Sequence, residues 1–234
     1  MISPYAPYPV RRPVMLQSWE SLTFLHWRYE PAVIARLLPN ELVLDTFDGS
    51  AWVGLTPFRL TNLRLPFGPP LPWISFFPEM NVRTYVLMPD GRRAVWFFTL
   101  ECDRLAAVLG ARLSFGLPYR WARMRVRDSG DVVEYESDRK GGPGSARISV
   151  RPGERLEAGE FDNFLTARYR LYSRIAKRSH FADIDHAPWP LQRAEVLSLE
   201  QNVVEHSGVP RPSGDPVVHF SRRLDVRIGG LHQG

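Results

Sequence analysis

Residues 80–100 read MNVRTYVLMPDGRRAVWFFTL, and this stretch predicts two β-strands joined by a tight turn. The strands are expected at Met80–Met88 and Ala94–Leu100, where β-branched and aromatic residues are frequent. Between them, Pro89-Asp90-Gly91 combines a proline that presets φ with a glycine that tolerates positive φ. The two strands are therefore expected to be antiparallel neighbours in one sheet.

The first of these strands has one polar and one apolar face. Alternate residues of a strand point to the same side of the sheet. The residues on the polar side are Glu79, Asn81, Arg83 and Tyr85. A half-exposed strand would show the same alternation. The following strand, however, is apolar on both faces, which is typical of a strand buried on both sides. If the two are neighbours, the polar row faces an enclosed cavity and forms a ligand site.

The rest of the chain predicts an α+β fold, made mainly of antiparallel strands with about three helices. Its 21 prolines and 17 glycines lie in turn-like clusters, which favours many short strands. Without a repeat or a long linker, residues 1–234 are expected to form a single domain that starts with an irregular arm over residues 1–14. Further strands are expected at 21–29, 51–60, 121–127, 131–137, 145–150, 191–201 and 217–228, helices at 30–38, 103–113 and 161–178, and a proline-rich loop at Leu65–Trp73.

The segment Phe161–Arg178 is predicted to be the best-formed helix. Its apolar stripe at helical spacing consists of Phe161, Phe164, Leu165, Leu171, Tyr172 and Ile175. Arg168 falls inside this stripe and is therefore expected to be buried. A buried guanidinium needs a carboxylate or several carbonyl groups to offset its desolvation. Arg168 is either half of a structural ion pair or an anchor for an anionic or carbonyl ligand.

Composition argues against several classes of protein. The net charge is +5, but the arginines are scattered among acidic residues and form no basic block, so no nucleic-acid partner is expected. No apolar run approaches the roughly 18 residues that span a bilayer, and the N-terminus lacks the pattern of a secretory signal. The expected location is the cytoplasm, without a membrane partner. Association into a homo-oligomer is left open.

The reactive side chains predict neither a metal site nor a cofactor. Cys102 is the single cysteine, so it forms no internal disulfide, and it is expected to be a buried structural thiol. His26 lies in an apolar strand and is expected to be a hydrogen-bonded core histidine. The segment His180–His186 holds two histidines and two aspartates, but their spacing matches no familiar metal motif.

Four segments, in this order and at this spacing, resemble the family called domain of unknown function 2071, which belongs to the acetoacetate-decarboxylase-like superfamily. They are PNELVLDTFDGSAWVGLTPF (39–58), PEMNVRTYV (78–86), ARLSFGLPYRWARM (111–124) and FLTARYRLYSR (164–174). The resemblance covers residues 15–228. It implies a cone-like or barrel-like, largely antiparallel β fold around a central pocket.

The more distant resemblance to acetoacetate decarboxylase implies roles for individual residues. The segment Trp27-Arg28-Tyr29-Glu30 is similar to a decarboxylase segment that would make Arg28 a pocket cation. Glu79 is similar to the pocket glutamate of that enzyme. The Schiff-base lysine lies in a Pro-Lys-Lys motif, and the matching run in this chain is Pro118-Tyr119-Arg120.

This departure removes the nucleophile of the decarboxylase mechanism. Schiff-base formation needs a neutral primary amine, which neither a phenol nor a guanidinium supplies. Only two lysines occur in the chain: Lys140 lies in a glycine-rich turn, and Lys177 is expected to be exposed near a helix end. Tyr119 remains as a proton donor or hydrogen-bond partner, and Arg120 as a cation. Schiff-base decarboxylation is therefore not expected.

Two functions are compatible with these residues. The first is a small-molecule-binding protein whose polar pocket takes a small carboxylate or keto compound. Its expected ligand-binding residues are Arg28, Asn81, Arg83, Tyr85, Arg120 and Arg168. The alternative is an enzyme without a covalent step, in which Glu79 is the general base and Tyr119 or an arginine stabilises an enolate. Enolisation, hydration or lyase chemistry on a small oxo-acid would suit these groups.

Overall fold

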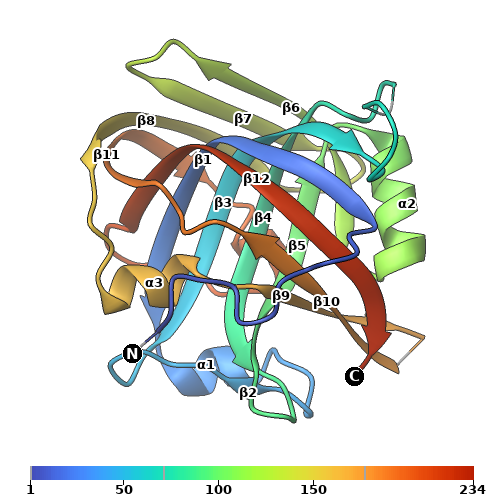
Figure 1. The fold of residues 1–234 in the computed structure, drawn as a ribbon. Coiled ribbons are helices and arrows are strands. Elements are labelled where there is room, and N and C mark those ends of the chain that lie inside the picture. Colours follow the sequence, from blue (N-terminus) through green and yellow to red (C-terminus); the bar gives the residue numbers. More distant parts are fainter. Residues whose placement is uncertain (1, 71, 177) are drawn as a thin grey trace.

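The computed structural model describes residues 2–70, 72–176 and 178–234. Its strands are β1 (Met15–Tyr29), β2 (Val43–Leu44), β3 (Ala51–Arg64), β4 (Phe77–Leu87), β5 (Arg93–Cys102), β6 (Tyr119–Asp128), β7 (Val133–Arg139), β8 (Ser145–Arg155), β9 (Arg170–Ile175), β10 (Arg178–His186), β11 (Leu191–Gln201) and β12 (Val217–Gln233). The helices are α1 (Pro31–Ala35), α2 (Leu105–Phe115), α3 (Glu160–Thr166) and the 3₁₀ turn η1 (Glu205–Ser207). The expected α+β class, with mainly antiparallel strands and three α-helices, is confirmed (Figure 1).

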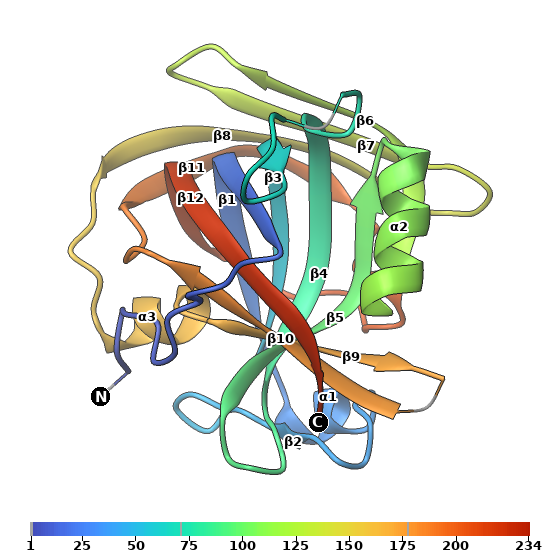
Figure 2. The same cartoon turned by 45° about the vertical axis from the view of Figure 1, so that its right-hand side comes forward.

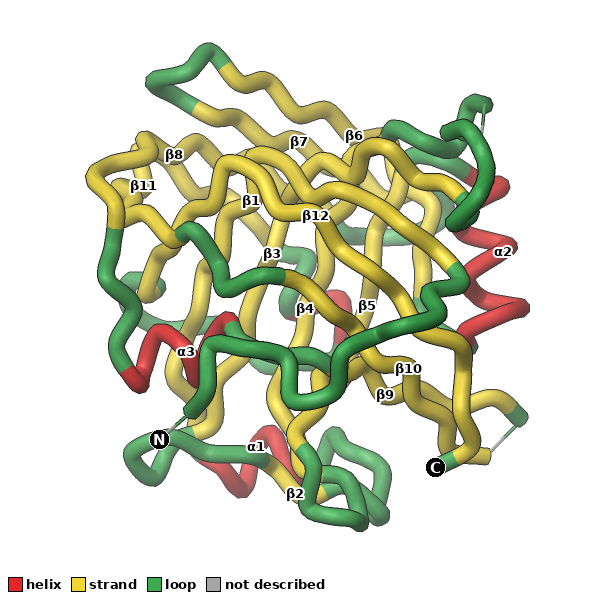
Figure 3. Tube along the Cα trace, in the orientation of Figure 1, coloured by secondary structure: helices red, strands yellow, loops and turns green. Residues whose placement is uncertain are grey.

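Seven strands close into a ring. Following the hydrogen-bonded pairs, β1 pairs with β3, β3 with β4, β4 with β5, β5 with β9, β9 with β10, β10 with β12, and β12 again with β1. All of these pairs are antiparallel except β5–β9. The helices lie at the periphery of the strands, as Figure 3 shows. The inside of this ring is where a central pocket can form.

The remaining long strands form a second layer. They run from β5 through β6, β7, β8 and β11 to β12, across the top of Figures 1 and 2. Between this layer and β1, β3 and β4 lies a large apolar core, which includes Leu55, Met80, Val82, Tyr135 and Ile148. On the right of Figure 2, α2 packs against β6, β5 and β9.

The two faces of β4 therefore have different surroundings. Met80 and Val82 belong to the apolar core between the layers. Glu79, Asn81 and Arg83 alternate with them and point to the inside of the ring. The predicted polar and apolar faces of this strand are thus real, and both are buried.

Strand β5 is apolar on both faces because one face lines the cavity and the other packs on the core between the layers, and a β-bulge interrupts its alternation. The register changes between the pairs Val82–Thr99 and Arg83–Phe97, so Phe98 is the extra residue. Because of this shift, Leu100 and Phe97 both face the inside of the ring, although they are three residues apart. The bulge bends β5 and changes which residues face inward.

The predicted long helix at 161–178 is wrong beyond its first turns. Helix α3 ends at Thr166, and Ala167 leaves the helical region at φ −83° and ψ 81°. The chain then forms β9, which pairs with β10 on one side and with β5 on the other. Tyr172 and Ile175 suit a strand as well as a helix, and the cross-strand pairing decides between the two. Arg168 lies in the connection between α3 and β9.

Other predicted boundaries shift less. The first helix spans Pro31–Ala35, and the second spans Leu105–Phe115, two residues later than expected. The segment at 180–186, considered for a metal, lies in β10. No group of three metal-ligating side chains gathers anywhere in the described ranges. Among the same residues, no helix has both the length and the apolar character needed to cross a membrane.

Gly54 allows three strands to pack closely next to the ring's polar face. In register, it stands between His26 on β1 and Arg83 on β4. A Cβ atom at Gly54 would lie 2.8 Å from His26 Nε2. The His26 ring cannot move easily, because it is fully buried and its Nε2 lies 2.5 Å from the Tyr85 hydroxyl. The expectation of a hydrogen-bonded core histidine is confirmed.

We therefore expect Gly54→Ala to lower the free energy of unfolding by about 1–3 kcal/mol, because the added methyl group overpacks a rigid site. Urea denaturation of the two proteins measures the difference. The matched control is Gly142→Ala, since a Cβ atom there meets nothing within 4 Å. Equal midpoints for the two variants would contradict this account of Gly54.

Candidate functional site

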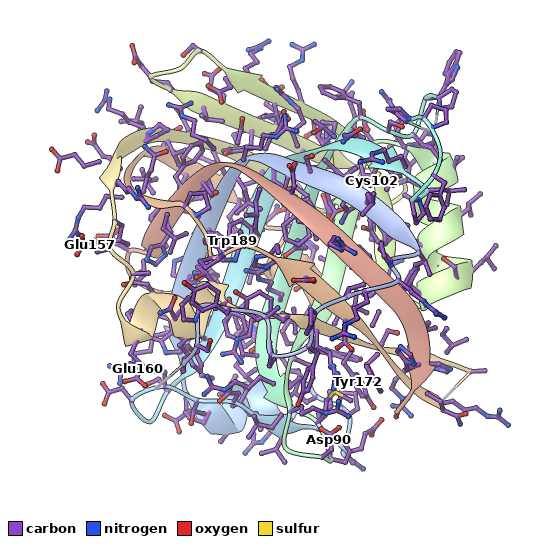
Figure 4. The ribbon with its side chains drawn as sticks, viewed as in Figure 1. Asp90, Cys102, Glu157, Glu160, Tyr172 and Trp189 are labelled. Atoms are coloured by element: carbon purple, nitrogen blue, oxygen red, sulfur yellow. The ribbon has the colours of Figure 1, made fainter. Side chains whose placement is uncertain are left out.

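A cavity of about 140 Å³ lies inside the seven-stranded ring. Every strand of the ring contributes to its wall, together with α2 and the start of β6. The polar side chains at the cavity are those of Gln17, Thr56, Glu79, Asn81, Arg83, Tyr119, Thr166 and Arg168. The aromatic ones are Trp19, Phe58, Phe97, Phe115 and Trp189, of which Trp189 is labelled in Figure 4. The cavity therefore combines a polar row with an aromatic wall, as small-molecule sites commonly do.

The polar row comes from β4 and its neighbour β3. Glu79, Asn81 and Arg83 occupy alternate positions of β4, and all three are buried. Thr56 on β3 pairs in register with Asn81, and it is fully buried. Cross-strand partners of this kind have Cβ atoms about 5 Å apart. Four polar side chains thus converge on one wall of the cavity.

Glu79 and Tyr119 form a hydrogen-bonded pair at one end of the row. The Tyr119 hydroxyl donates to Glu79 Oε2 at 2.7 Å. Burial raises the pKa of Glu79 to about 7, although hydrogen bonds from Tyr119 and Asn81 act in the opposite direction. Burial and the nearby Glu79 raise the pKa of Tyr119 well above its usual value. Near neutral pH the pair therefore holds a neutral phenol beside a carboxyl group that exchanges its proton readily.

Arg83 lies at the other end of the row, and two nitrogens on one edge of its guanidinium have no hydrogen-bond partner among the described residues. Its side chain is buried, and it forms no ion pair with any residue that the structure describes. Neither Nε nor Nη2 has a hydrogen-bond partner within the described ranges. The guanidinium packs over the rings of Phe24, at 5.1 Å, and Tyr85, at 5.9 Å. Burial, with the positive charge of Arg83 as the second cause, lowers the pKa of His26 well below its usual value.

Arg168 also borders the cavity, but its donors are occupied. Nη1 donates to Asp45 at 2.6 Å, and Nε and Nη2 donate to the carbonyl oxygen of Phe164 at 3.0 and 2.8 Å. The guanidinium lies 4.4 Å from the centre of the Tyr85 ring. Of the two predicted roles for Arg168, the structural ion pair is the one that its contacts support.

Three of the predicted site residues lie outside the cavity wall. Arg28 is exposed over 61% of its side chain, where it contacts Ser50 and Asp48. Arg120 is exposed because it follows the inward-facing Tyr119, and neighbouring strand residues point to opposite sides. Arg28 and Arg120 are therefore not pocket cations. Tyr85 is fully buried beneath Arg83 and Arg168.

The Tyr85 hydroxyl is engaged within the protein. It donates to the carbonyl oxygen of Leu165, so His26 Nε2 donates to it in turn. This chain of hydrogen bonds ties β4 to β1 and to the end of α3. The Tyr85 ring therefore packs under the guanidinium groups of Arg83 and Arg168, and its hydroxyl has no donor left for a ligand.

Lys140 and Cys102 do not line the cavity. Lys140 lies after β7, exposed, with its Nζ 3.9 Å from the centre of the Trp121 ring. The prediction for Lys177 falls outside the described residues, as does Leu71 within the predicted loop. Cys102 (labelled in Figure 4) is fully buried at the end of β5, and burial raises the pKa of its thiol. The expected structural thiol is confirmed.

Sequence reasoning missed Thr56 and the aromatic wall. Thr56 is a polar residue in the otherwise apolar run Ala51–Phe58, and that isolation is the signal that could have marked it. The aromatic residues carry no such signal, because Trp19, Phe97 and Trp189 look like ordinary core residues. They come together only when the ring closes.

Comparisons with known proteins agree with this architecture. Residues 16–225 match the family called domain of unknown function 2071, described as an uncharacterized conserved protein. The uncharacterized protein YqjF of Bacillus subtilis (strain 168) is 39% identical over 224 residues, covering 94% of this chain and 92% of that protein.

Solved structures show the same fold at low identity. The enduracididine biosynthesis enzyme MppR, complexed with pyruvate, is similar with a TM-score of 0.68 and 12% identity, covering 97% of this chain and 92% of that one. Acetoacetate decarboxylase from Legionella pneumophila is similar with a TM-score of 0.66 and 14% identity, over 97% and 92% of the two chains. The chain therefore belongs to the domain of unknown function 2071 family and has an acetoacetate-decarboxylase-like fold.

Proposed function

We propose that this protein binds a small organic anion, a carboxylate or an oxo acid, in the cavity inside the ring. The observation that carries the proposal is the unpaired guanidinium edge of Arg83. A buried charge without a partner costs several kcal/mol. A bound anion would supply the missing partner. Binding would then relieve the unfavourable free energy of the unpaired buried charge, and this gain would contribute to the affinity for the ligand.

The geometry of the free atoms favours a carboxylate. Nε and Nη2 lie on the same side of a guanidinium, and their N–H bonds point in parallel. Two such donors match the two oxygens of a carboxylate in a bidentate pair. Arg83 is also buried, which strengthens its interaction with an opposite charge. MppR, which has a similar fold, was solved in complex with pyruvate, a small carboxylate.

The binding we propose is non-covalent. In this protein the residue that follows Pro118 is Tyr119, which contributes a phenol to the cavity. Lys140 faces Trp121 on the outer side of the second layer. A Schiff base needs an amine that reaches the ligand. A mechanism through a lysine imine is therefore not part of this proposal.

An alternative function is catalysis by proton transfer, favoured by the pair of Glu79 and Tyr119. A pKa of about 7 suits a general base at neutral pH. On an oxo acid, Glu79 would take a proton from the carbon next to the ketone, and that C–H electron pair would form a C=C bond. The carbonyl oxygen would then receive the proton of the Tyr119 hydroxyl, and Glu79 would return its proton to Tyr119. The product is the enol of the same acid.

Replacing Arg83 with Met tests the proposal of anion binding. We expect Arg83→Met to lose carboxylate binding by at least 100-fold, because the bidentate partner is gone. In the absence of ligand, the same change should raise the free energy of unfolding by about 1–3 kcal/mol, because an unpaired buried charge is removed. Calorimetric titration and urea denaturation measure the two effects.

The control is Arg120→Met, an exposed arginine of β6 outside the cavity. It should change neither affinity nor stability by more than experimental error. If Arg83→Met binds the same acids as tightly as the unchanged protein, Arg83 is not the anion site.

Hydrogen exchange tests the alternative. With 2-oxo-4-methylpentanoate in D₂O, NMR spectroscopy follows loss of the proton signal at the carbon next to the ketone. Catalysed exchange should fall at least 100-fold in Glu79→Gln, while affinity for the acid changes less than threefold. Exchange no faster than in buffer with the unchanged protein would reject catalysis and leave binding as the function.

The pKa of Glu79 predicts a dependence of stability on pH. Its pKa is raised in the folded state, so between about pH 4.5 and 7 the folded protein binds more protons than the unfolded chain. Stability is therefore lost as pH rises through this window. Glu79→Gln removes this titration, so its stability advantage over the unchanged protein should grow by about 2–3 kcal/mol from pH 5 to pH 8. Urea denaturation at each pH gives the comparison, and a constant difference would show that Glu79 titrates normally.

A further inference from the structure

Three more polar atoms of cavity residues are buried without a partner. One is Nε1 of Trp19 on β1, and the other two, Oγ1 of Thr56 and Oδ1 of Asn81, belong to residues that pair in register across β3 and β4. Of the Asn81 amide, the oxygen Oδ1 is the atom that is buried without a partner, and it is a hydrogen-bond acceptor. A free acceptor calls for a hydrogen-bond donor on the ligand.

The position of these atoms places that donor beside the ligand's carboxylate. Asn81 and Arg83 are separated by one residue on β4 and point to the same side. A ligand whose carboxylate pairs with Arg83 thus brings its neighbouring carbon close to Asn81 and Thr56. A keto oxygen there accepts only, so it cannot satisfy Asn81 Oδ1. A hydroxyl can donate to Asn81 and accept from Thr56 at once.

An ammonium group would also donate, but its charge disfavours it. In the proposed complex the ligand's own carboxylate pairs with Arg83, and the atoms without a partner beside it, Oδ1 of Asn81 and Oγ1 of Thr56, are uncharged. An ammonium group buried against uncharged acceptors loses its hydration without gaining a charged partner. This argues against an amino acid as the ligand.

The apolar lining of the cavity determines the rest of the ligand. It includes Trp19, Phe58, Phe97, Leu100, Leu171 and Trp189. Trp19 and Trp189 stack at 5.7 Å, which makes a rigid apolar surface. Such a wall favours a branched or aromatic side chain over a methyl group.

We propose that the ligand of this cavity is a 2-hydroxy acid with a branched or aromatic side chain. This inference rests on the proposed function, because it requires that Arg83 holds a carboxylate. The hydroxyl bridges Asn81 and Thr56, and the side chain packs against the tryptophan pair. The site thereby distinguishes a hydroxy acid from the oxo acid and from the amino acid of the same carbon skeleton.

Calorimetric titration of the full chain with four acids of one skeleton tests the inference. They are 2-hydroxy-4-methylpentanoate (each enantiomer separately), 2-oxo-4-methylpentanoate, 4-methylpentanoate and leucine. We expect one enantiomer of the hydroxy acid to bind at least tenfold more tightly than the oxo acid and the unsubstituted acid, because these leave a buried acceptor unsatisfied. Leucine should not bind measurably. Lactate, which lacks the branched side chain, should bind at least tenfold more weakly than the hydroxy acid.

Variants identify the atoms responsible. Asn81→Leu and Thr56→Val should each reduce the preference for the hydroxy acid over 4-methylpentanoate to less than threefold. The matched control is Thr99→Val on β5, whose hydroxyl is equally buried and unpaired but does not line the cavity. It should keep the full preference. The comparison of acids on the unchanged protein stands on its own if a variant fails to fold.

The outcomes separate this inference from the proposed function. Equal affinity for the hydroxy, oxo and unsubstituted acids would overturn the inference while supporting carboxylate binding. Tighter binding of the oxo acid than of the hydroxy acid would also overturn the inference and support carboxylate binding. If no acid binds, both proposals fail. Tighter binding of the hydroxy acid that persists in both cavity variants would overturn the assignment of Asn81 and Thr56.

Discussion

The division of one edge of β5 between two strands controls the architecture of this protein. One edge of β5 pairs with β4 along most of its length. On the other edge, Val95 and Trp96 pair with β9, while Leu100 to Cys102 pair with β6. Backbone groups of one edge bond only one neighbour at a time, so the sheet must branch here. One branch closes the seven-stranded ring, and the other forms the layer over the large core.

A buried ion pair lies at this branch. Glu101 is fully buried at the end of β5, where it accepts hydrogen bonds from Ser137 at 2.6 Å and from Arg139 at 2.8 Å. Because both partners come from β7, the pair ties the second layer to the ring. This carboxylate is fully compensated within the protein. Arg83 on the neighbouring strand has no such partner in the described ranges, and this contrast marks Arg83 as a group that serves a ligand.

Much of the site on β4 could be predicted because it depends on local geometry. The alternation of a strand puts Glu79, Asn81 and Arg83 on one face whatever the rest of the chain does. The apolar run at 94–100 correctly indicated that this face is covered. Arg28 and Arg120, which were assigned from the similarity of short segments to acetoacetate decarboxylase, lie outside the cavity wall.

The sequence by itself determined the fold class and the polar face of β4. Both of these follow from residue identity and the two-residue period of a strand. Tertiary structure alone decided that 170–175 is a strand, that a bulge reverses the inward face of β5, and that Thr56 and Trp189 meet at the cavity. These features depend on pairings between residues far apart in the chain. Such pairings form only when the ring closes. The residues of one strand do not determine which distant strand will pair with it, so its partners cannot be predicted from that segment alone.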